Sequence, residues 1–160
     1  MNIRISIARQ ILDLFDDDGQ WLASYPVSTA LNGVGEEAGS CRTPRGNHLI
    51  RAKIGVDCPP ATVFVGRRPT GEIWTPELAA QYPKRDWVLS RILWLSGSEP
   101  GRNRLGQCDS MRRYIYIHGT PDDQPMGQPA SHGCIRMRNA DIIALFDRVP
   151  VYTPVEISET

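Results

Sequence analysis

The chain has 160 residues, a length that suits one domain and can bury a hydrophobic core without disulfide bonds or metal ions. Its 18 basic and 18 acidic residues give a formal net charge of zero, and like charges do not cluster, so the composition argues against nucleic acid or an anionic membrane surface as a partner. No stretch approaches the roughly 18 apolar residues of a membrane-spanning helix. We therefore expect one domain over residues 1–160.

The N-terminal segment alternates apolar and polar residues over 3–7, which is typical of a strand and unlike the apolar core of a signal peptide. Residues 11–15 and 21–27 predict two further strands, joined by a turn at 16–19. Because no signal peptide is present, we expect a cytoplasmic protein, or a periplasmic one if an export signal has been removed from this sequence.

The middle of the chain predicts short strands separated by long polar loops. Residues 28–46 form the first loop, which ends in the turn sequence Thr43-Pro44-Arg45-Gly46, and 96–110 form the second. Thr75 and Pro76 suit the N-cap and first position of a short helix that ends at Gln81. The expected strands cover 48–54, 62–65, 73–74, 91–95 and 113–117, with a turn at 69–71. The last of these strands is apolar or aromatic on both faces, which indicates a buried central strand with His118 at its end.

A second helix is expected after Asn139, which can serve as its N-cap. The helix carries apolar residues at a spacing of three and four, and Pro150 ends it. Residues 151–157 predict a last strand, placed at a sheet edge because Pro154 interrupts it. Together these elements indicate a mainly β fold, mostly antiparallel, with one or two short helices and long loops that converge on the candidate site.

The tetrapeptide Ser131-His132-Gly133-Cys134 follows His118 after a short loop. This motif is the strongest indication of function in the sequence. A cysteine with a histidine partner is the equipment for nucleophilic acyl transfer. A lone cysteine is more often a small core residue, but this combination favours catalysis. Four cysteines without C-x-x-C spacing predict free thiols, and we interpret Cys41, Cys58 and Cys108 as inert.

The residues around Cys134 predict how the thiol is activated. A neighbouring imidazolium or aligned backbone amides can lower a thiol pKa, and His118 is the candidate base. The second nitrogen of His118 can donate to a backbone carbonyl, with that of Gly119 nearest in sequence. Gly133 lets the amides of Gly133 and Cys134 face a developing oxyanion. In an extended chain Arg136 projects on the same side as Cys134 and can bind a carboxylate.

From residue 113 to 157 the chain resembles the bacterial L,D-transpeptidase family with its YkuD-type domain. The signature of that family is a histidine, a loop, and then Ser/Thr-His-Gly-Cys, a hydrophobic residue, and Asn or Arg. The matching positions are His118, Ser131, His132, Gly133, Cys134, Ile135 and Arg136. Residues 3–27, the 43–46 turn and the 97–106 loop are also similar, so the resemblance covers nearly the whole chain. It implies a YkuD-like antiparallel β-sandwich.

The resemblance implies that Cys134 attacks the bond between the third residue of a peptidoglycan stem and the following D-alanine. It assigns His118 as general base, the Gly119 carbonyl as the group that orients His118, and His132 and Gly133 to the amide-rich oxyanion pocket. The candidate substrate contacts are Ser131, Arg136, Tyr116 and Asn103. The expected partners are stem peptides or muropeptides, with carbapenem β-lactams as covalent inhibitors, and no cofactor or metal is expected.

Two departures from the family pattern bear on which molecule accepts the acyl group from Cys134. The loop between His118 and Ser131 is shorter than in many relatives, and this sequence shows no export signal or anchor. Both favour small soluble donors and water as acceptor, which is L,D-carboxypeptidase activity. The alternative is L,D-transpeptidase activity that forms 3-3 cross-links.

Functions of other classes were weighed as well. His118, His132, Cys134 and Cys108 could in principle form a zinc site, but their spacing is unlike the usual zinc motifs. A non-catalytic wall-binding module would leave the thiol and imidazoles without a role. The four tryptophans are scattered and predict core or rim positions instead of a sugar platform, and His48 is interpreted as a packing or solvent-exposed residue.

Overall fold

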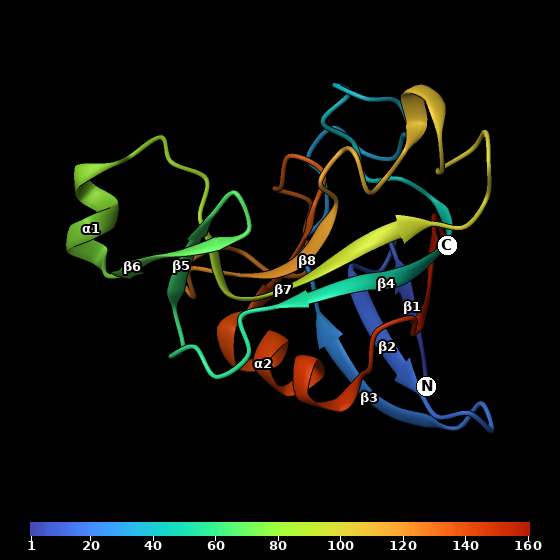
Figure 1. Cartoon of the computed structure of the whole chain (residues 1–160), viewed down its shortest axis with the longest axis horizontal. Coiled ribbons are helices and arrows are strands. Elements are labelled where there is room, and N and C mark those ends of the chain that lie inside the picture. The colour runs from blue at the N-terminus through green and yellow to red at the C-terminus, as the bar shows by residue number, and fades with distance from the viewer.

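The computed structural model describes residues 1–160 and contains mainly β-structure (Figure 1). None of its helices is long and apolar enough to span a membrane. The strands are β1 (Asn2–Ser6), β2 (Ile11–Phe15), β3 (Trp21–Pro26), β4 (Gly46–Ile54), β5 (Thr62–Val65), β6 (Arg68–Ile73), β7 (Val88–Gly97), β8 (Tyr116–Thr120), β9 (Ile135–Arg138) and β10 (Pro154–Ser158). The helices are α1 (Pro76–Gln81), α2 (Asn139–Arg148) and a 3-10 turn at Gly106–Cys108.

All ten strands belong to one curled sheet, with the order β3-β2-β1-β10-β4-β7-β5-β6 and with β8 and β9 added beside β7. β7 is the centre of the sheet, since β4 and β5 share one of its edges and β8 pairs with the other. Most pairs are antiparallel, whereas β1 with β10 and β8 with β9 are parallel. The predicted mainly β class with two short helices is therefore confirmed.

Three predictions about strands and turns are wrong. β10 lies inside the sheet between β1 and β4, where Pro154 is tolerated because it is the first residue of the strand. The strand expected at 113–117 is β8, shifted toward the C-terminus, so His118 lies in its middle instead of at its end. The turn expected at 69–71 lies within β6, and the chain reverses at Gly66 and Arg67 instead.

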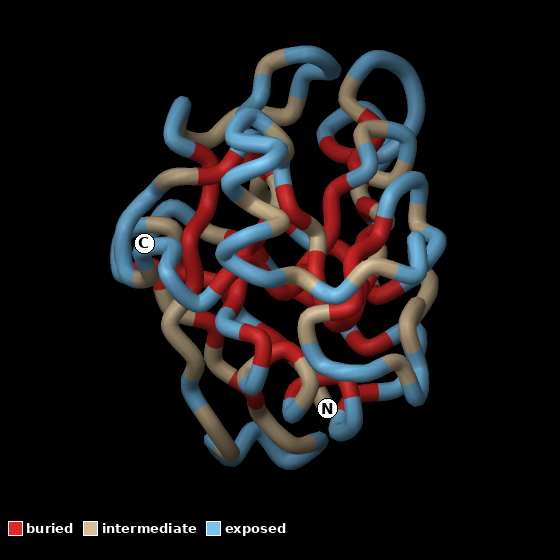
Figure 2. The backbone as a smooth tube through the Cα atoms, turned by 90° about the vertical axis from the view of Figure 1, so that its left-hand side faces the viewer, coloured by how far each residue is buried: buried red, intermediate tan, exposed pale blue.

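The main hydrophobic core lies between the sheet and α2, which packs against β7, β8 and β9 (Figure 1). Buried segments fill the middle of the molecule and the exposed ones are mostly loops (Figure 2). The apolar face of α2 presents Ile142, Leu145 and Phe146, as the spacing predicted. At the end of this helix the ammonium of Lys53 donates to the carbonyls of Phe146 and Val149, which is favourable at the negative pole of a helix.

The start of α2 differs from the prediction. The N-cap residue is Arg138, and its side chain makes no capping bond. Asn139 lies in the first turn, and its side chain instead bonds to the hydroxyl of Ser90 and the carbonyl of Thr120. Asp122, from the loop between β8 and β9, accepts from the Asn139 amide at 3.3 Å. The cap therefore comes from a distant segment, which also fixes the helix to the strand that carries His118.

Replacing Leu145 by alanine tests how far α2 supports the fold. Leu145 is fully buried in the main core, so Leu145→Ala should lower the free energy of unfolding by about 2–5 kcal/mol. Asp147→Ala, on the exposed face of the same helix, is the control and should change it by less than about 0.5 kcal/mol. Urea denaturation followed by circular dichroism measures both, and equal effects would contradict the assigned core.

Candidate active site

The parallel pairing of β8 with β9 builds the candidate site. His118 lies opposite Arg136, and Ile117 lies opposite Ile135. Because side chains alternate along a strand, His118 and Arg136 share one face while the two isoleucines enter the core beneath α2. Cys134, two residues before Arg136, packs beside Tyr116 on the same face as His118. The sheet therefore brings together the predicted thiol, the predicted base and the predicted guanidinium.

His118 is held rigidly by its own strand. It is 1 % exposed, and its Nδ1 donates to the carbonyl oxygen of Gly119 at 2.6 Å, the contact that the sequence predicted. A side chain at Gly119 would lie 2.5 Å from the Leu89 carbonyl and 2.7 Å from Oδ1 of Asn139, so only glycine fits. Burial lowers the pKa of His118, so the imidazole is neutral and its Nε2 lone pair is available as a base.

The resting Cys134 differs from the expected thiolate. The backbone N–H of Tyr116 approaches Sγ at 3.3 Å, and the thiol can donate to the Tyr114 carbonyl at 3.3 Å. Burial nevertheless raises the pKa of Cys134 to about 11. The expectation of a lowered thiol pKa is therefore wrong for the resting site, because burial outweighs the single amide donor. Thiol and imidazole both start neutral.

The turn before Cys134 is held together by Ser131. Its buried hydroxyl donates to the Cys134 carbonyl at 2.6 Å and accepts from the Gly133 amide at 3.2 Å. The hydroxyl of Ser131, predicted as a substrate contact, is thus buried and bonded within the turn. Gly133 has φ +134, which L side chains rarely adopt. The amides of His132 and Cys134 have no partner in the chain and remain free to donate.

Thr43, which the sequence placed only in a turn, supports the same segment from the first long loop. Its hydroxyl donates to the Gly133 carbonyl at 2.9 Å and accepts from the Ala30 amide at 3.0 Å. No motif connects Thr43 to the site, because the two residues that bond are 90 positions apart in the chain. The first long loop is therefore part of the support of the nucleophile.

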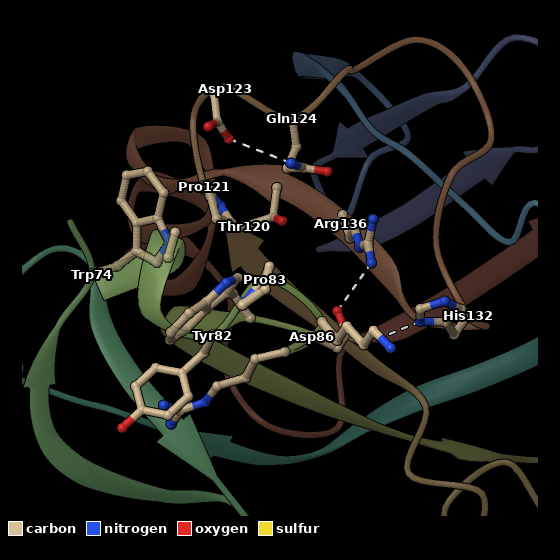
Figure 3. Close-up of a pocket in the computed structure, with 14 residues that line it drawn as sticks. Trp74, Tyr82, Pro83, Asp86, Thr120, Pro121, Asp123, Gln124, His132 and Arg136 are labelled. Atoms are coloured by element: carbon tan, nitrogen blue, oxygen red, sulfur yellow. Dashed lines mark hydrogen bonds and ion pairs between the residues drawn. The ribbon is translucent and has the colours of Figure 1, made fainter. Parts of the chain in front are cut away.

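Asp86 is the second residue that sequence analysis missed. Its carboxylate accepts from Nη2 of Arg136 at 3.0 Å and lies 3.4 Å from Nδ1 of His132 (Figure 3). Burial alone would raise the pKa of Asp86, but His118, Arg136 and His132 together hold it below its usual value. Asp86 follows α1 in a segment without a recognisable motif, so only the tertiary structure reveals its position.

Two cavities lie on either side of His132. The first, about 320 Å³, is lined by Trp74, Tyr82, Asp86, Asp123, His132 and Arg136 (Figure 3). The second, about 290 Å³, is lined by Cys41, Arg112, Arg113, Ile115, His132 and Cys134. The nucleophile therefore opens into a cleft that carries guanidinium groups, and Arg136 belongs to the neighbouring cavity.

Tyr116 and Asn103, two other predicted substrate contacts, form hydrogen bonds with other residues of the chain. Tyr116 is buried, accepts from Arg67 at 3.0 Å through its hydroxyl, and packs edge-on against Trp94. Asn103 is fully buried, and its amide nitrogen donates to the carbonyls of Arg45 and Asn47 at 3.0 Å each. The structure leaves Asn103 no exposed atom for a substrate, because the loop around it uses all of its polar groups.

The ligands considered for zinc do not come together. Cys108 bonds to the Leu105 carbonyl and lies in a cavity apart from that of Cys134. Groups of three or more His, Cys, Asp or Glu side chains that could hold a metal ion do not occur in the structure. All four cysteines are free thiols, as predicted.

Comparison with known proteins gives the family. The L,D-transpeptidase catalytic domain model, YkuD, matches residues 2–157. The chain belongs to this family. The resemblance inferred from the motif around Cys134 is thereby confirmed.

Known relatives share the domain but are longer. The probable L,D-transpeptidase YbiS of Escherichia coli is 35% identical over 108 residues, which cover 65% of this chain and 34% of the relative. A solved structure of LdtMt1 in complex with imipenem has a TM-score of 0.56 and 19% identity, and covers 98% of this chain and 57% of that one. L,D-transpeptidase 3 from Mycobacterium tuberculosis, with a faropenem-derived adduct, has a TM-score of 0.58, 18% identity and coverages of 98% and 59%. The structures therefore share the fold of this chain.

His48 lies outside the site, in the interior, as the packing interpretation anticipated. Its ring nitrogens bond to the Gly46 carbonyl of its own strand at 3.1 Å and to the Ser110 hydroxyl at 2.8 Å, which connects β4 to the second long loop. Burial lowers the pKa of His48 to about 4. A protonated His48 is therefore unfavourable in the folded state.

This shift predicts an acid-sensitive fold. An unfolded histidine takes up its proton near pH 6.5 but the folded one only near pH 4, so stability should be complete above pH 6.5 and fall by about 3 kcal/mol as the pH drops to 4. Urea denaturation of wild type and His48→Gln across this range isolates the contribution of His48. The difference between the two proteins should change with pH, and a constant difference would contradict the assignment.

Proposed function

We propose that this domain is a cysteine acyltransferase that cleaves the L,D-peptide bond of peptidoglycan stem tetrapeptides, between the third residue and D-alanine. The observation that carries the proposal is the placement of Cys134 and His118 on one face of two paired strands. The bond from His118 to Gly119 leaves Nε2 of His118 as the base. Membership of the L,D-transpeptidase family supports the substrate class.

The reaction starts from a neutral thiol and a neutral imidazole. As Sγ of Cys134 bonds to the carbonyl carbon, the thiol proton passes to Nε2 of His118, and the amides of His132 and Cys134 donate to the oxyanion. When the carbon–nitrogen bond breaks, His118 returns the proton to the departing amine of D-alanine. Water then attacks the thioester carbonyl while its proton passes to His118. When the carbon–sulfur bond breaks, the tripeptide is released and His118 returns the proton to the Cys134 sulfur.

Water is the acceptor that we infer for the second step. The cleft of Cys134 carries the guanidinium groups of Arg112 and Arg113, which suit the carboxylates of a donor and repel an ammonium acceptor. The nearby carboxylate of Asp86 is already paired with Arg136 and His132. An acceptor amine therefore lacks a free anionic partner beside the nucleophile, which favours L,D-carboxypeptidase activity over cross-linking.

The neutral resting thiol predicts a contrast between two reagents. At pH 7 a thiol with a pKa of about 11 is thiolate only to about one part in ten thousand, so iodoacetamide should label the exposed Cys41 before Cys134. A carbapenem, whose ring opens as His118 takes the proton, should instead add to Cys134 alone. Intact-protein mass spectrometry and peptide mapping measure both reactions.

Two variants control this experiment. Cys134→Ala should abolish the carbapenem adduct, and His118→Gln should slow its formation by about two to four orders of magnitude. Rapid iodoacetamide labelling of Cys134 would contradict the neutral pair. A carbapenem adduct on another thiol would contradict the assigned nucleophile.

The choice of acceptor is tested with a tetrapeptide that contains diaminopimelate, with or without its disaccharide. Mass spectrometry should find tripeptide and free D-alanine as the main products, because water has no charged competitor held in the cleft. A second stem peptide added as acceptor should give only minor dimer. Dimer as the main product would establish the transpeptidase alternative, and Cys134→Ala is the control for both products.

A further inference from the structure

The position of Asp86 is fixed by its neighbours in the chain. Trp87 is buried against Val63 and Leu89, and the guanidinium of Arg85 stacks on its ring at 4.5 Å. Arg85 also forms an ion pair with Glu72 of β6 at 2.9 Å. The segment before β7 is therefore anchored on both sides of Asp86, and the carboxylate is held at the edge of the first cavity.

The surroundings of His118 disfavour the positive charge that its imidazole carries once it has taken the thiol proton. Its Nδ1 partner is a neutral carbonyl, whereas the third group of a serine protease triad is a carboxylate. Burial disfavours the imidazolium, and the cationic Arg136 lies directly opposite on β9. The charged side chains that act on His118 are Arg136 from β9 and Asp86 from the segment before β7. Asp86 is the anion of this pair.

We propose that Asp86 is a positioning residue of the acyl-transfer site, whose carboxylate neutralises Arg136, orients His132 and stabilises the imidazolium form of His118. The proposal rests on the proposed function for its catalytic consequence. The contacts that carry it are the 3.0 Å bond to Nη2 of Arg136 and the 3.4 Å approach to Nδ1 of His132 (Figure 3). Each carboxylate oxygen has its own partner, so the group bridges the two side chains.

The charge of Asp86 favours the protonated form of both reacting groups, which hinders Cys134 but helps His118. It raises the pKa of His118 and also the pKa of the Cys134 thiol. It therefore disfavours a resting thiolate but favours the proton on His118 once transfer has occurred. His118 takes up that proton as Cys134 bonds to the carbonyl carbon, so the effect of Asp86 falls on formation of the tetrahedral intermediate.

Titration of His118 tests the electrostatic part without any substrate. Asp86→Asn keeps the size of the side chain and removes its charge, so the His118 imidazole should titrate at lower pH than in wild type, as followed by NMR. Asp86→Glu keeps the charge and should titrate close to wild type. Asp147→Asn is the control, because Asp147 is exposed on α2 and lines neither cavity.

Turnover of the tetrapeptide tests the catalytic part. A base must be neutral to act, so kcat/KM rises with pH through the pKa of His118, and Asp86→Asn should move this acidic limb to lower pH. The plateau should fall by about ten- to hundredfold, mainly in kcat, since loss of groups that orient a functional histidine has costs of this size. Asp86→Glu should recover part of the rate, and Asp147→Asn should stay within about twofold of wild type.

The outcomes separate this proposal from the proposed function. An unchanged His118 titration in Asp86→Asn overturns the electrostatic role, whatever the enzyme hydrolyses. A shifted titration with an unchanged acidic limb and rate overturns the catalytic role. Absence of turnover in wild type would overturn the proposed function, while the titration would still decide whether Asp86 sets the charge of His118.

Discussion

The parallel pairing of β8 with β9 is the constraint on which the site depends. Its register places His118 opposite Arg136 and sends Ile117 and Ile135 into the core. A slip by one residue would reverse the two faces, exposing the isoleucines and burying the imidazole beneath α2. The hydrophobic contacts of α2 therefore select the register that the chemistry needs, and the core and the catalytic geometry have a common cause.

A neutral carbonyl as the partner of His118 has consequences for the whole site. It fixes the orientation of the ring but offers no charge to offset an imidazolium, so the resting pair stays neutral. Charge then develops only during the reaction, on an imidazole that is almost wholly buried. The ion pair of Arg136 and Asp86 matters here because both of its charges act on His118, one of them from a segment that is remote in sequence.

Much of the fold follows from local patterns. The N-terminal strands, the helix after Thr75 and the apolar face of α2 were predicted because alternation, a capping residue and a helical spacing are properties of adjacent residues. Cys134 and His118 were predicted as a catalytic pair because their motif is short and specific. Thr43 and Asp86 were missed because their roles depend on contacts across the fold, and Pro154 was misplaced because the sheet order decides whether a strand is an edge.

Buried polar side chains give the long loops their rigidity. His48 and Asn103 hold the second loop against β4, and Thr43 fastens the first loop to the turn before Cys134. Each would leave an unpaired buried group if its partner were lost, at a cost of about 1–3 kcal/mol, so the loops have one favourable arrangement. A loop-rich protein can thereby hold a nucleophile and a base in a fixed geometry, and orientation is a large part of what acyl transfer requires.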